Sequence, residues 1–72
     1  MKLPQISGKD IIKILFKNGF VVVRQKGSHV TLEKNTEKGT IKITVPIHKT
    51  LKKGTLHQII KASGLKDEDL FN

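Results

Sequence analysis

The sequence predicts an α+β domain in which two helices cover one face of a three-stranded antiparallel sheet. Apolar residues recur at helical spacing near both ends of the 72-residue chain. Between them lie three runs rich in β-branched residues, separated by turn-forming residues. The resulting order is α-β-β-β-α, and strands joined by short turns pair antiparallel. Because the chain has no linker and no internal repeat, we expect a single domain over residues 1–72.

The first helix is expected between a cap at Ser7 and a stop at Asn18-Gly19. Ser7 can accept a backbone hydrogen bond, and the acidic Asp10 three residues later completes the pattern of a helix start. Gly19 tolerates the left-handed conformation that ends many helices. The apolar arc consists of Ile11, Ile12, Ile14, Leu15 and Phe16. The opposite side carries Lys9, Lys13 and Lys17, which form either a solvated stripe or a surface for phosphates.

Three strands are expected over residues 20–26, 29–34 and 40–45. Pro46 ends the third, because proline cannot donate to a strand ladder. The apolar residues of the second strand must share the buried face with Ile41 and Ile43. A four-residue loop over 35–38 meets this condition and puts Leu32 opposite Ile41. His29 then points away from the core, at the end of a strand beside a tight turn.

The second helix is expected from Gly54-Thr55 to Ser63-Gly64. Its inward residues are Leu56, Ile59, Ile60 and Ala62 or Ser63, and its outward residues are His57, Gln58 and Lys61. Residues 67–71 add at most one terminal turn.

The charge balance favours a nucleic-acid partner. Fourteen Lys and Arg against six Asp and Glu give a net charge of +8, which is typical of nucleic-acid-binding domains. A generally soluble surface or an acidic protein partner would also account for it. Three Phe and no Tyr or Trp argue against a platform that stacks single-stranded bases.

Several classes of protein are excluded by composition. The chain has no cysteine, which removes disulfides and thiolate metal sites. Its acids are too scattered for a two-metal nuclease, and its histidines lack metal-ligand spacing, so we expect no metal and no cofactor. The N-terminus has no secretory signal, and no apolar stretch approaches the roughly 20 residues of a membrane span. We therefore expect a cytoplasmic protein.

The candidate catalytic groups are histidines, whose ordinary pKa of about 6.5 suits acid-base chemistry near neutral pH. His29 follows Gly27-Ser28, where glycine permits close approach of a ligand and Ser28 adds a donor. Glu33 lies about 13 Å along the same strand, too far to orient His29. His48 either binds phosphate or orders its loop. His57 is expected to be solvated.

The basic residues form two further sets of candidates for RNA binding. Arg24 and Lys26 flank the turn before His29, and Lys42 shares the outer face of the predicted sheet. The other set precedes the second helix, whose N-terminal N–H groups favour an anion, and consists of Lys49, Lys52 and Lys53.

Two segments resemble the HicA family of mRNA interferases, the toxins of type II HicAB toxin–antitoxin pairs. The first is Arg24-Gln25-Lys26-Gly27-Ser28-His29, and the second runs from Val45-Pro46-Ile47-His48 through Leu51-Lys52-Lys53-Gly54-Thr55-Leu56. The Gly-Ser-His motif alone is weakly specific. Its combination with the second segment at this spacing is highly specific, and with Ser7-Gly8-Lys9-Asp10 and Gly19-Phe20 the resemblance spans nearly the whole chain.

The resemblance implies a fold similar to double-stranded-RNA-binding domains, a catalytic histidine at His29, cleavage of mRNA and neutralisation by a HicB antitoxin. The mechanism we expect is metal-free attack of the RNA 2′-hydroxyl on the adjacent phosphodiester, with His29 as general base or acid. Two alternatives remain open at this point. One is a non-catalytic RNA-binding module with the same fold, and the other is an inactive toxin relative that survives as a protein-interaction domain.

Overall fold

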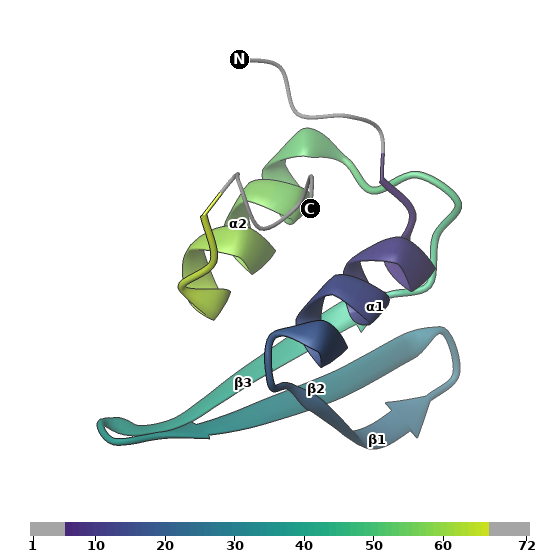
Figure 1. Ribbon diagram of the computed structural model, residues 1–72. Helices are drawn as coiled ribbons and strands as arrows, with labels where there is room; N and C mark the ends of the chain where they lie inside the picture. The colour runs from purple at the N-terminus through teal and green to yellow at the C-terminus, as the bar shows by residue number, and fades with distance from the viewer. Residues whose placement is uncertain (1–5, 67–72) are drawn as a thin grey trace.

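The computed structural model describes residues 6–66 and contains two helices and three strands in the predicted order (Figure 1). The elements are α1 (Gly8–Lys17), β1 (Val21–Lys26), β2 (His29–Thr36), β3 (Gly39–Pro46) and α2 (Lys53–Ser63). The strands form one antiparallel sheet in the order β1-β2-β3. Both helices cover the same face of the sheet, and the other face is open. The α+β prediction is therefore confirmed, while the turn expected over residues 67–71 lies outside the described residues.

Helix α1 begins and ends where the capping pattern predicts. The Ser7 hydroxyl accepts a 3.1 Å bond from the Asp10 N–H, and the Ser7 N–H donates to the Asp10 carboxylate at 3.3 Å. These reciprocal bonds form a capping box, which satisfies backbone donors that a helix start leaves unpaired. At the other end Asn18 is the C-cap and Gly19 takes a positive φ of 95°. Helix α2 likewise ends at Gly64, in the left-handed conformation.

The core lies between the sheet and the two helices. It is built by one apolar stripe from each helix and by alternate residues of β2 and β3, with Phe20, Ile11, Leu15, Leu32, Leu56 and Val45 as its largest fully buried side chains. The expectation that Phe16 belongs to the buried arc is wrong, because its side chain is 66% exposed. Phe16 lies about 100° round the helix from Leu15, beyond the stripe that faces the sheet.

The β2–β3 hairpin has a shorter loop than the sequence predicts. Thr36 pairs with Gly39, so only residues 37 and 38 form the loop, and Leu32 lies opposite Ile43 instead of Ile41. The Thr36 hydroxyl donates to the Gly39 carbonyl at 2.8 Å and accepts from the Lys38 N–H at 3.2 Å. The pairing differs by two residues from the predicted one. Because side chains alternate with a period of two, every residue keeps its predicted face.

Strand β1 is an edge strand and carries apolar side chains that the core does not cover. A β-bulge falls between Val22 and Arg24, which adds one residue to the edge and increases its local twist. Val21, Val22 and Val23 are 53%, 51% and 49% exposed. The β-branched run therefore predicts the strand correctly, although the side chains of that strand are not buried.

Candidate nucleic-acid interface

His29 is the first residue of β2 and its side chain is exposed. The neighbouring Val30 is buried against the helices, so the pleat of the strand directs His29 to the open face of the sheet. Lys26 is its partner on β1 and Pro46 is its partner on β3. The predicted outward orientation at the end of a strand is confirmed, although the residue opposite is Pro46 and not Thr44.

The open face also carries three of the basic residues singled out from the sequence. Lys26 lies beside His29, and Arg24 is paired with Thr31 on the next strand. Lys42 lies further along the sheet, directly opposite Glu33 on β2. Thr31 and Thr44 place their hydroxyls 3.3 Å apart on the same face. Arg24 and Lys26 are thus the cations that this face brings closest in register to His29.

The turn before His29 is hydrogen-bonded to the segment that follows β3. Gly27 has φ +60° and Ser28 a negative φ, the arrangement of a tight hairpin turn with glycine first. The Ser28 carbonyl accepts a 2.6 Å bond from the Ile47 N–H. This bond brings the backbone next to His48 against the backbone next to His29, an approach that sequence spacing does not reveal.

The start of α1 is hydrogen-bonded to the same segment. The Gly8 N–H donates to the His48 carbonyl at 2.8 Å, and the Leu51 N–H donates to the Ile6 carbonyl at 2.9 Å. A Cβ on Gly8 would collide with the Pro46 carbonyl oxygen and lie 3.0 Å from the Ile47 Cα. Three segments distant in sequence therefore meet at one end of the sheet: the Gly27-Ser28 turn, residues 46–48 and the first turn of α1.

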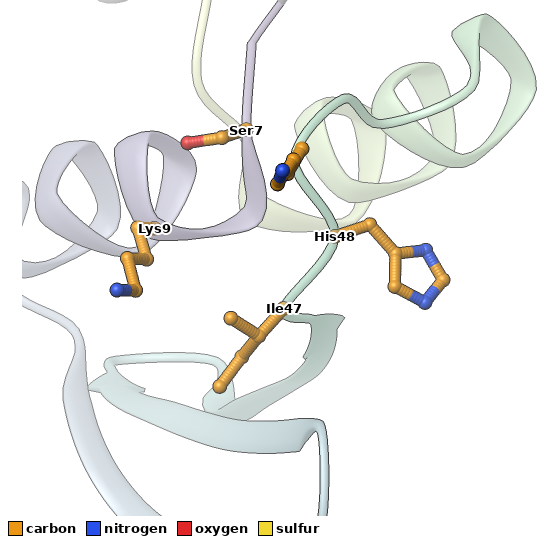
Figure 2. Close-up of a pocket in the computed structure, with 5 residues that line it drawn as sticks. Ser7, Lys9, Ile47 and His48 are labelled. Atoms are coloured by element: carbon orange, nitrogen blue, oxygen red, sulfur yellow. The ribbon is translucent and has the colours of Figure 1, made fainter.

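A cavity of about 360 Å³ opens where α1 meets this segment, and it is lined by Ser7, Lys9, Ile47, His48 and Lys49. Figure 2 shows Lys9 and Ile47 on its two sides, while the imidazole of His48 points away from Lys9. The sequence predicts Lys49 as a phosphate contact, and His48 as either a phosphate contact or a residue that orders its loop. Lys9 joins them only through tertiary packing, and the sole signal for it in the sequence is the lysine stripe of α1.

The remaining predicted RNA-binding residues, Lys52 and Lys53, lie at the start of α2. Both are exposed, and Lys52 is the N-cap without a side-chain capping bond. Neither lines the cavity beside Lys49. His57 is exposed on the outer side of α2, as predicted.

Electrostatics at the start of α1 is dominated by the capping box. The hydrogen bonds from Ser7 to the Asp10 carboxylate hold the pKa of Asp10 below its ordinary value, with a smaller contribution from the Lys13 charge. The Asp10 carboxylate is thus hydrogen-bonded at the start of its own helix. Within residues 6–66, no group of three or more His, Asp or Glu side chains is close enough to hold a metal ion.

The described part of the chain has no helix long and apolar enough to cross a membrane. Its fold and its exposed cations define a small basic α-β-β-β-α domain with one open sheet face. Residues 8–65 match the model of the HicA toxin of bacterial toxin–antitoxin systems. Since the match spans most of the 72 residues, the chain belongs to the HicA toxin family. A comparison with curated proteins finds no matching sequence.

Proposed function

We propose that the protein is the toxin of a HicAB-type pair and a metal-independent endoribonuclease that cuts mRNA in the cytoplasm with His29. Membership of the toxin family supports the toxin role. The observation that supports the chemistry most directly is the exposure of His29 on the open sheet face, at a tight turn and with Lys26 as its strand partner. An imidazole in that position can reach RNA without any rearrangement of the core.

In the proposed reaction His29 removes the proton of a 2′-hydroxyl. The 2′-oxygen attacks the adjacent phosphorus, the bond from phosphorus to the 5′-oxygen breaks, and the products are a 2′,3′-cyclic phosphate and a 5′-hydroxyl end. General base catalysis of this kind contributes about 10²- to 10⁴-fold. Arg24 and Lys26 balance the charge that develops on the phosphoryl oxygens. His48, two residues past the strand partner of His29, is our candidate for protonating the leaving 5′-oxygen.

The partner that neutralises the toxin is proposed to be a HicB-type antitoxin that covers the face around His29. The chain carries a net charge of +8, and the described open face holds Arg24 and Lys26 near His29, with Lys42 further along the sheet. An antitoxin with acidic residues at its contact surface complements this face, as electrostatic complementarity speeds and orients association. The same face would then serve RNA and antitoxin in turn.

The test is expression of three chains in bacteria: wild type, His29→Ala and, as a matched control, His57→Ala, which removes an exposed histidine of α2. We expect growth arrest and mRNA loss from wild type and His57→Ala, and neither from His29→Ala at equal protein level. Arrest by all three would refute the role of His29. Absence of arrest in all three, with RNA binding retained, would favour a non-catalytic RNA-binding module.

A further inference from the structure

We propose that the cavity between α1 and the segment after β3 binds a phosphate of the RNA backbone, with Lys9 and Lys49 as its cationic ligands. This inference rests on RNA being the substrate, as in the proposed function, and adds a second contact point away from His29. It also gives Lys9 a role that the sequence pattern leaves undecided.

The walls of the cavity are held by backbone hydrogen bonds. The Gly8 N–H to His48 carbonyl bond of 2.8 Å and the Leu51 N–H to Ile6 carbonyl bond of 2.9 Å tie the chain before and within α1 to residues 48–51. Lys9 and Lys49 are forty positions apart in sequence, yet both line this one cavity of about 360 Å³. The site is therefore formed before any ligand arrives, which lowers the ordering cost of binding.

The charge within the cavity suits an anion. None of the described residues that line it is acidic, while Lys9 and Lys49 are both exposed cations. The nearby carboxylate of Asp10 accepts from Ser7 and caps its own helix, so it does not compete for the lysines by a direct bond. A phosphate bound in the cavity would be attracted by both ammonium groups.

The position of the cavity relates it to the proposed catalytic residue. Ile47 lines the cavity, and its N–H is bonded to the Ser28 carbonyl at 2.6 Å, one residue before His29. The apolar side of Ile47 (Figure 2) offers a surface for a ribose between two phosphates. The proposed site thus lies at the same end of the sheet as His29, and an RNA strand bound at His29 would have to pass round this end to bring a phosphate to Lys9 and Lys49.

The experiment measures binding of a 2′-O-methyl RNA oligonucleotide, which keeps the phosphates and lacks the attacking hydroxyl, as a function of salt concentration. The chains are wild type, Lys9→Gln, Lys9→Arg, Lys49→Gln and Lys13→Gln. Lys13 is the control because it is exposed on the same helix and does not line the cavity. Each phosphate contact on a single strand contributes about 0.7 to the slope of log affinity against log salt. We expect Lys9→Gln and Lys49→Gln each to lower the slope by about 0.7 and the affinity about two- to fivefold near 0.1 M salt.

We expect Lys9→Arg to restore the slope and Lys13→Gln to leave it close to wild type. A slope for Lys9→Gln that equals that of Lys13→Gln would overturn the phosphate site. So would a loss confined to binding of the antitoxin, which would make the cavity a protein contact. Cleavage of unmodified RNA is measured in parallel. A chain that binds with a Lys9-dependent slope and cuts no RNA would refute the proposed nuclease and leave this site standing.

Discussion

Gly8 offers the sharpest test of how the end of the sheet is assembled. A Cβ at this position would collide with the Pro46 carbonyl oxygen and approach the Ile47 Cα to 3.0 Å. Both obstacles are backbone atoms, so relief requires α1 to move away from residues 46–48. That movement strains or breaks the 2.8 Å bond from the Gly8 N–H to the His48 carbonyl.

The loss of stability expected for Gly8→Ala can be worked out from the collision and the affected hydrogen bond. Overpacking costs about 1–3 kcal/mol and a lost hydrogen bond about 1 kcal/mol, while the better helix propensity of alanine returns at most about 1 kcal/mol. We expect a net loss of about 1–3 kcal/mol in the free energy of unfolding. At about 4–8 °C per kcal/mol for a domain of this size, the melting temperature falls by about 4–24 °C.

The assay is thermal unfolding followed by far-ultraviolet circular dichroism, with Gly54→Ala as the matched control. Gly54 also lies in the first turn of a helix, and a Cβ there meets no heavy atom within 4 Å. Gly54→Ala should therefore be neutral or stabilising by up to about 1 kcal/mol. Equal melting temperatures for the two variants would refute the close packing of α1 on residues 46–48.

Two further predictions concern acid and metal. The hydrogen bonds from Ser7 lower the pKa of Asp10 in the folded protein. The ionised Asp10 carboxylate therefore stabilises the fold fully above its ordinary pKa of about 3.9. This stabilisation is lost as the pH falls through the lower pKa of the folded state. Urea unfolding at pH 7 and pH 2.5 should show a larger acid-induced loss in wild type than in Asp10→Asn, and equal losses would contradict the capping box. RNA cleavage by the purified protein should be unchanged by excess EDTA, and loss of activity that Mg²⁺ restores would contradict the metal-free mechanism.

Much of the fold could be predicted because local signals and the apolar pattern agree. Ser7 with Asp10 marks the start of α1, and Pro46 marks the end of β3. The loop of the β2–β3 hairpin could not be predicted, since pairings two residues apart bury the same side chains. The observed pairing is accompanied by hydrogen bonds of the Thr36 hydroxyl at 2.8 and 3.2 Å, which hydrophobic periodicity does not indicate.

The candidate site could be predicted only in part, for a different reason. The outward position of His29 follows from strand alternation, and the basic turn beside it is contiguous in sequence. The approach of residues 47–48 to the turn depends on the bond between Ile47 and Ser28. Lys9 reaches the cavity because Gly8 has no side chain to hold α1 away from Pro46. Such tertiary contacts leave no periodic signal along the chain.

The central claim, that His29 cuts RNA, is tested most directly by incubating purified protein with an end-labelled RNA oligonucleotide and analysing the new ends. We expect upstream fragments that end in a 2′,3′-cyclic phosphate with wild type and His57→Ala. With His29→Ala we expect a cleavage rate lower by about 10²-fold or more. Cleavage by His29→Ala at the wild-type rate, or upstream fragments that end in a free 3′-hydroxyl, would contradict the claim.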